Sequence, residues 1–183
     1  MKHTLLLQGP SFDGGAGSRY QAKREIRSFW YPTWLAQPAA LIADSRLLDA
    51  PADGLSVDAA LDIAAQYELV IIHTSTPSFP SAAFCAEKLK TRAPSILIGM
   101  VGAKVAVDPH TSLIASDAID FVCREEFDFT CKEIAEGRAF ASIRGLSYRL
   151  PDGSIEHNEA RPILENMDEL PFVAPVYKRD LNT

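Results

Sequence analysis

Long hydrophobic runs, an excess of positive charge and a metal-binding cysteine pattern are all missing from this 183-residue sequence. No apolar stretch approaches the roughly 18 residues that a membrane-spanning helix needs, so we predict no transmembrane segment. The net charge of −6 argues against nucleic acid as a partner, because nucleic-acid binding depends on basic surfaces. Three cysteines without metal-ligand spacing favour a reduced, cytoplasmic setting.

Several common phosphate-binding signatures are also absent. The segment 9–19 contains four glycines but lacks the Gly-Lys-Ser/Thr ending of a nucleoside triphosphate loop. A dinucleotide fingerprint would need glycine where Tyr20 stands, and an acidic residue about 20 residues further on at a strand end. Nucleotide or flavin binding therefore stays a minor alternative, beside the simpler interpretation that the glycines only let the loop turn. A receiver domain is excluded, because the third predicted strand ends at His73 instead of an aspartate.

Strand-like and helix-like patterns alternate along the first 140 residues. Residues 69–72 (LVII) are all apolar and end in a polar loop, which indicates a strand buried on both faces of a parallel sheet. The other predicted strands are 4–7, 46–49, 95–99 and 118–122, and the predicted helices are 32–42, 56–67, 81–92, 109–115 and 127–136. This alternation predicts a flavodoxin-like three-layer α/β fold with the parallel strand order 2-1-3-4-5.

The pattern changes after Gly137. Residues 143–150 and 154–157 flank Pro-Asp-Gly, a strong turn signal, and so predict a β-hairpin. Residues 161–183 have no sustained period, so we predict an extended arm that leads into a longer protein. The expected organisation is a Rossmann-type domain at 1–140, a hairpin at 141–160 and a linker arm at 161–183.

Two stretches resemble a known family. Residues 120–130 (DFVCREEFDFT) resemble the D-x-V-x-x-G-E-x-E-x-T motif that closes the cobalamin-binding-type domain of many radical SAM enzymes. Residues 143–149 (IRGLSYR), 152–153 (DG), 161–162 (RP) and 168–172 (DELPF) follow in the order found in that family before its catalytic barrel. Within the family, residues 12–20, 29–35 and 102–109 are most similar to its hopanoid biosynthesis-associated members.

The resemblance implies a domain that caps a C-terminal radical SAM barrel, which would bind S-adenosylmethionine and a 4Fe-4S cluster and act on a lipid-like hopanoid. The cluster motif Cys-x-x-x-Cys-x-x-Cys is absent here, so this segment is expected to be inactive alone. Asp-x-His-x-x-Gly is also absent, which implies cobalamin held without a histidine ligand. The family's usual Gly-Gly and Gly-Glu pairs are replaced around residues 99–102 and at 125–126, so a cofactor-free docking domain stays an alternative.

The resemblance places the cofactor at the carboxyl ends of the strands, where open parallel sheets bind their ligands. Glycines there would allow close backbone approach, and hydroxyl groups would supply hydrogen bonds. The candidate cofactor-binding residues are Ser11, Phe12, Gly14, Gly15, Thr74, Ser75, Thr76, Val101, Gly102, Ala103, Arg124, Glu125 and Glu126. We predict no catalytic residue and no metal ligand, because His73 has no visible partner and the side chains of the adjacent Glu125 and Glu126 point apart.

Overall fold

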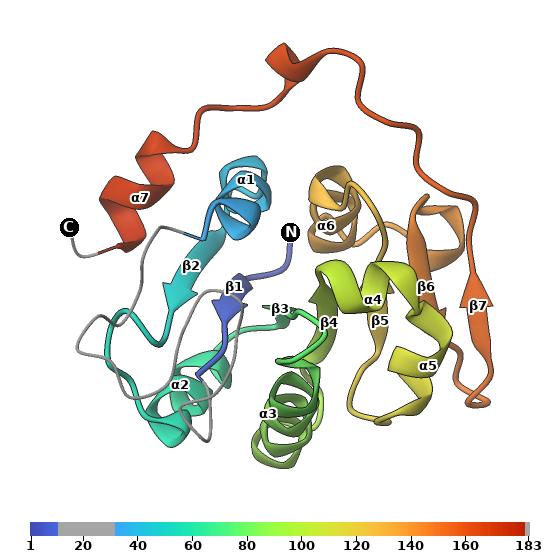
Figure 1. Ribbon diagram of the computed structural model, residues 1–183, viewed down its shortest axis with the longest axis horizontal. Helices are drawn as coiled ribbons and strands as arrows, with labels where there is room; N and C mark the ends of the chain where they lie inside the picture. Colours follow the sequence, from blue (N-terminus) through green and yellow to red (C-terminus); the bar gives the residue numbers. More distant parts are fainter. Residues whose placement is uncertain (11–31, 182–183) are drawn as a thin grey trace.

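A single, mainly parallel sheet organises the computed structural model, which describes residues 1–10 and 32–181 (Figure 1). Across the described residues the strand order is β2-β1-β3-β4-β5-β6-β7, which confirms the predicted 2-1-3-4-5 and extends it. The parallel strands are β1 (Thr4–Gln8), β2 (Ser45–Asp49), β3 (Leu69–His73), β4 (Leu97–Val101) and β5 (Phe121–Cys123). The hairpin strands β6 (Leu146–Arg149) and β7 (Ile155–His157) are antiparallel and pair onto β5.

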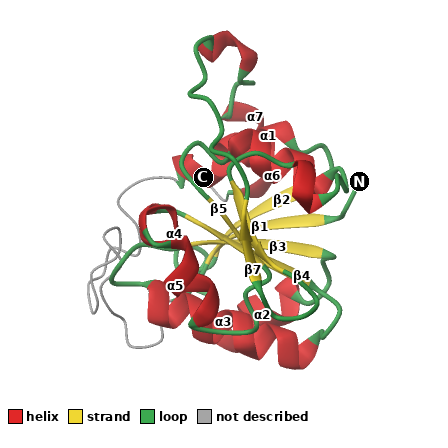
Figure 2. Cartoon of the chain, turned by 90° about the vertical axis from the view of Figure 1, so that its right-hand side faces the viewer, coloured by secondary structure: helices red, strands yellow, loops and turns green. Residues whose placement is uncertain are grey.

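Helices cover both faces of the sheet, as a three-layer fold requires (Figure 2). One face carries α1 (Thr33–Leu41), α6 (Asp128–Ala135) and α7 (Ala174–Asp180). The other carries α2 (Val57–Ala64), α3 (Phe79–Arg92), α4 (Ala103–Val107) and α5 (Pro109–Ile114). Short 3-10 turns form η1 (Phe140–Ser142) and η2 (Met167–Glu169). Within the described ranges, no helix has the length and hydropathy needed to span a membrane.

The unbroken apolar run of strand β3 reflects its burial on both faces of the sheet. Neighbouring side chains of a strand point to opposite faces of the sheet. Val70 and Ile72 accordingly pack into the core on the α2–α3 face, whereas Leu69 and Ile71 pack into the core on the α1–α6 face. All four are fully buried, and each such side chain contributes about 1.5–3 kcal/mol to folding. The predicted two-sided burial is therefore confirmed.

The ends of the helices largely follow local sequence signals. All five predicted helices are present, and their ends differ from the prediction by at most three residues. Ser56 caps α2, because its hydroxyl accepts a hydrogen bond from the Ala59 N–H at 3.2 Å. Gly137 follows α6 with φ +80°, the left-handed conformation that commonly ends a helix.

Strand β5 starts three residues later than predicted, at Phe121. The carboxylate of Asp120 accepts a hydrogen bond from the Ile98 N–H at 2.7 Å and forms an ion pair with Lys90 at 2.8 Å. Asp120 therefore ties the amino end of β4 to α3 just before β5 begins. Strand β4 is also displaced, covering 97–101 instead of 95–99, and the short helix α4 that follows it was not predicted.

The chain beyond the hairpin is extended as predicted but contains one unpredicted helix, α7. Val176 and Leu181 are buried against α1 and β2, and the carboxylate of Asp180 accepts a hydrogen bond from the Leu47 N–H at 2.8 Å. A seven-residue helix is unstable in isolation and depends on such packing. The local sequence therefore gave no periodic signal for it. In Figure 1 the first part of the arm, residues 161–173, runs over α6 and α1 and leads into α7.

Gly99 provides a test of the packing between β4 and β5. A Cβ atom at this position would lie 2.0 Å from two atoms of the Phe121 ring. We expect Gly99→Ala to lower the free energy of unfolding by about 1–3 kcal/mol, because a filled core resists extra volume. Urea denaturation measures this change. Phe121→Leu makes room for the methyl group, so the double variant should lose less stability than the two single changes added together, and strict additivity would contradict the explanation.

Candidate functional site

The carboxyl ends of the parallel strands lie in register along one edge of the sheet. Gln8 pairs with Asp49 at the ends of β1 and β2, and His73 pairs with Val101 at the ends of β3 and β4. The loops that follow these strands therefore start side by side. This edge is where open parallel sheets place their ligand sites.

The loops after β3 and β4 are locked together at Thr74 and Gly102. The Thr74 N–H donates to the Val101 carbonyl at 2.8 Å. Gly102 has φ +114°, and a Cβ atom there would lie 2.1 Å from the Thr74 carbonyl oxygen. Glycine is thus required at residue 102 both for its backbone conformation and for the close approach of the two loops. The structure brings together the predicted site residues Thr74, Val101 and Gly102.

The hydroxyl groups after β3 form a small network of their own. Ser78 Oγ lies 2.9 Å from Ser75 Oγ and accepts a hydrogen bond from the Ser75 N–H at 2.8 Å. Thr74 is fully buried, with Oγ1 3.4 Å from Ser78 Oγ. Thr76 and Ala103 are exposed at this rim, and Ser75 is partly exposed. Among the three hydroxyl residues predicted to contact a ligand, Ser75 and Thr76 are therefore the accessible ones.

An aromatic pair lies beside these loops and was not predicted as a unit. The ring of Trp34, in the first turn of α1, lies 4.8 Å from the ring of His73. Trp34 Nε1 donates to Gln8 Oε1 at 3.4 Å. Gln8, Trp34 and His73 come from three elements that are far apart in sequence, so no local motif could indicate their contact. Only the aromatic segment that contains Trp34 and the position of His73 at a strand end are recognisable from the sequence.

The end of β2 is acidic. Asp49 is buried, and Asp53 follows it in the next loop. Burial raises the pKa of the Asp53 carboxyl above its usual value, the Asp49 carboxylate raises it further, and Arg46 acts in the opposite direction. This corner would repel an anionic group. Within the described residues, no group of three or more His, Cys, Asp or Glu side chains is arranged to hold a metal ion.

The predicted site residues after β5 contact the hairpin and the arm. The Arg124 N–H donates to the Gly145 carbonyl at 2.8 Å, and its guanidinium donates to the Asn158 carbonyl. Glu126 accepts a hydrogen bond from the Leu164 N–H at 2.8 Å, and Glu125 is exposed with φ +53°. The role of Arg124, Glu125 and Glu126 in cofactor binding stays a prediction. The remaining candidates lie outside the described residues and stay predictions: Ser11, Phe12, Gly14 and Gly15.

Comparison with known proteins finds similarity in sequence to one protein and in fold to parts of larger enzymes. No protein-family model matches the chain. The chain is 27% identical over 159 residues to the uncharacterized methyltransferase PH0819 of Pyrococcus horikoshii. Its fold is similar to part of the cobalamin-dependent S-adenosylmethionine radical enzyme OxsB, solved with aqua-cobalamin and S-adenosylmethionine, with a TM-score of 0.66 and 11% identity. It is also similar to part of the radical S-adenosylmethionine methyltransferase TsrM from Kitasatospora setae, solved with cobalamin and a [4Fe-4S] cluster, with a TM-score of 0.63 and 14% identity.

These relatives are much longer than the chain. The match to PH0819 covers 82% of this chain but 34% of the relative. The likeness to OxsB covers 87% of this chain and 22% of OxsB, and the likeness to TsrM covers 93% and 31%. The comparisons therefore confirm the predicted fold class, a flavodoxin-like domain of the kind found within cobalamin-dependent radical SAM enzymes.

Gly102 allows a direct test of the locked loops. Gly102→Ala adds strain in the left-handed conformation and a collision with the Thr74 carbonyl, whereas Gly137→Ala adds strain without a collision, because a Cβ atom at 137 meets nothing within 4 Å. We expect Gly137→Ala to lower the free energy of unfolding by about 1–2 kcal/mol, and Gly102→Ala to lower it by roughly twice as much or more. Chemical denaturation of both variants measures the difference. Equal losses would show that the loops after β3 and β4 do not need their close contact.

Proposed function

We propose that this chain is the cobalamin-binding-type domain of a radical SAM enzyme. The observation that carries the proposal is the similarity of its fold to parts of OxsB and TsrM, two enzymes solved with cobalamin. The motifs at residues 120–130 and 143–172 independently resemble the same family. In this proposal the carboxyl edge of the sheet faces the cofactor, as it does for ligands of open parallel sheets in general.

The residues at this edge suit the hydrogen-bonding periphery of cobalamin better than its cobalt. Ser75 and Thr76 present hydroxyl groups, the small side chain of Ala103 leaves room beside them, and Gly102 lets the two loops approach each other closely. The amides and nucleotide phosphate of cobalamin are hydrogen-bonding groups that such hydroxyls can meet. When bound, cobalamin supplies radical and alkyl-transfer chemistry. The chain's own residues would bind and orient it, and the predicted absence of a histidine ligand to cobalt is part of the proposal.

The chemistry itself would belong to a further part of the protein. The chain spans between 22% and 34% of the relatives it matches. In our proposal a C-terminal radical SAM barrel binds S-adenosylmethionine and the 4Fe-4S cluster, and this domain caps that barrel. The sequence resemblance extends the proposal to hopanoid side-chain biosynthesis with a lipid-like hopanoid substrate.

A second candidate is a docking domain of the same enzyme that holds no cofactor. It is favoured by the contacts of Arg124 and Glu126, which bind the hairpin and the arm, and by Thr74, whose hydroxyl is buried within its own loop. Three of the predicted cofactor contacts would then serve the fold of the domain. The two candidates differ in one property that is easily measured, the binding of cobalamin.

Titration with hydroxocobalamin tests the proposal. We expect the 183-residue chain to shift the corrin absorption bands, with part of the cofactor changing from base-on to base-off. Ala103→Trp places a bulky ring on the rim and should weaken binding on the order of tenfold, which corresponds to about 1.4 kcal/mol. Ala139→Trp, at an exposed site between α6 and η1, is the matched control and should bind normally. No spectral change up to millimolar hydroxocobalamin would favour the docking domain instead.

The hopanoid assignment has its own test. Deleting the gene in its host should remove or alter hopanoids with extended polar side chains, because the proposed substrate would accumulate. Mass spectrometry of the extracted lipids measures this. An unchanged hopanoid profile would argue against the substrate while leaving the cofactor proposal intact.

A further inference from the structure

A concave feature lies between the arm and the start of α6, next to the loop that follows β5. It is a cavity of about 400 Å³. Its apolar lining includes Phe129 from α6 and Ile163, Leu164, Met167 and Leu170 from the arm. A volume of this size can accept a large side chain or a small ligand. Neither the proposed cofactor site nor the fold explains it.

The arm that forms this cavity is anchored by polar contacts along its length. Arg161 donates to Thr130 Oγ1 at 2.9 Å and forms an ion pair with Glu133. The Leu164 N–H donates to Glu126, and Gln37 Nε2 donates to the Pro171 carbonyl at 2.9 Å. The backbone of the arm is therefore held in place without the help of its large apolar side chains.

Three of the large apolar side chains of the arm are exposed to solvent. Ile163 is 77% exposed, Met167 66% and Phe172 91%. Three large apolar groups within ten residues of the chain give the arm exposed apolar surface of the kind that marks a protein interface. Because the backbone of the arm is already anchored, it would lose little conformational entropy on binding a partner, and this favours association.

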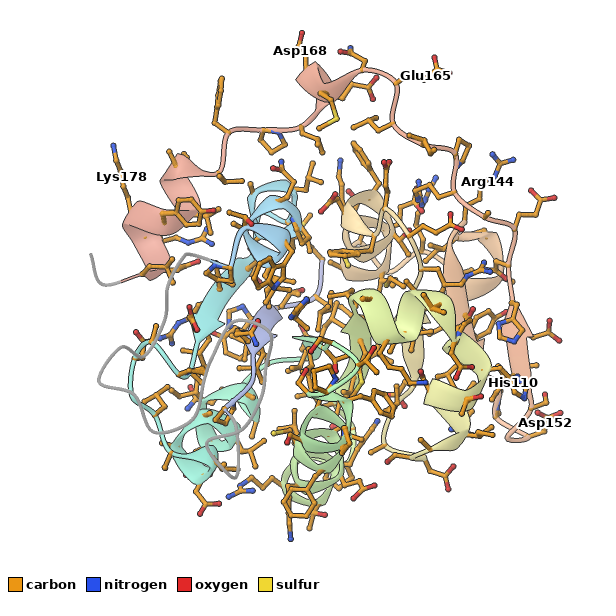
Figure 3. All side chains as sticks on the ribbon, in the orientation of Figure 1. His110, Arg144, Asp152, Glu165, Asp168 and Lys178 are labelled. Carbon is orange, nitrogen blue, oxygen red and sulfur yellow. The ribbon has the colours of Figure 1, made fainter. Side chains whose placement is uncertain are left out.

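The surroundings of the cavity are acidic. Its lining includes the carboxylates of Glu126, Asp128, Glu165 and Glu169, whereas its one basic group, Arg161, is already paired with Glu133. Figure 3 shows Glu165 and Asp168 projecting outward from the arm. Burial and, to a smaller extent, the nearby Glu126 carboxylate raise the pKa of the Asp128 carboxyl to about 6. A positive charge placed in the cavity would relieve this unfavourable arrangement.

We propose that the arm and this cavity are the docking surface for the catalytic domain of the same protein, which presents a lysine or arginine side chain to the cavity and apolar residues to Ile163, Met167 and Phe172. The proposal rests on the proposed function, in which such a domain is present, and names the surface that it contacts. The length of the relatives supports this choice of occupant, since the match covers 34% of PH0819.

Two other occupants fit the surface less well. A second copy of the chain in a symmetric dimer would bring one acidic arm against another, and like charges oppose such an interface. A small organic cation could enter the cavity but would leave Phe172, which does not line it, exposed to water. A basic, partly apolar protein surface would cover both the acidic cavity and the exposed apolar side chains of the arm.

Hydroxyl-radical footprinting of the full-length protein tests the proposal by mass spectrometry. The chain offers matched residue pairs, because Ile114 is 59% exposed against 77% for Ile163, and Met1 is 62% exposed against 66% for Met167. We expect Ile163 and Met167 to be labelled at least about fivefold less than Ile114 and Met1, because the centre of a protein interface excludes water. Labelling of Ile163 and Met167 at the level of their matched residues would overturn the proposal.

Charge reversal supplies the second readout. Glu169→Lys should restore labelling of Ile163 and Met167, whereas Glu156→Lys, on exposed β7, should leave their protection unchanged. Protection that survives Glu169→Lys would overturn the cationic partner, and protection that disappears on dilution would indicate a second copy instead.

Hydroxocobalamin titration of the same samples separates the two proposals. Protection without cobalamin binding counts against the cofactor alone, and cobalamin binding without protection counts against the docking surface alone.

Discussion

Burial of the parallel strands on both faces is the constraint on which the rest of this structure depends. Leu5, Leu6 and Leu7 of β1 and residues 69–72 of β3 are fully buried, and they divide between the two core clusters. Such strands need a helical layer on each side, and parallel neighbours need crossover connections. The strand ends and the following loops are thereby collected at one edge. The candidate cofactor site is a consequence of that packing.

This constraint explains why much of the fold was predictable. An unalternating apolar run such as 69–72, a cap such as Ser56 and a stop such as Gly137 are encoded within a few neighbouring residues. The contacts of Asp120 just before β5 are different, because Ile98 and Lys90 are far from it in sequence. Helix α7 depends likewise on burial of Val176 and Leu181 against α1 and β2.

The same distinction applies to the candidate site. Sequence patterns placed Thr74 and Gly102 at strand ends, and register alone then brings them together. Sequence patterns could not show that Trp34 contacts both Gln8 and His73, nor that Glu126 accepts a hydrogen bond from the backbone of the arm. The direction of a side chain at the end of a short strand is decided by its tertiary neighbours. The sequence pattern therefore located residues 124–126 after the fifth strand but did not predict which residues they contact.

The proposed cofactor site and the proposed docking surface differ in the chemistry of their residues. The rim formed by Ser75, Thr76 and Ala103 is small and neutral, which suits a ligand that is recognised by hydrogen bonds and close approach. The arm combines exposed apolar groups with carboxylates around a cavity, which suits a protein surface of opposite charge. Arg124 joins the end of β5 to the hairpin, and Glu126 joins the loop after β5 to the arm. A catalytic domain resting on the arm would therefore be mechanically linked to the strand ends where the cofactor is proposed to bind.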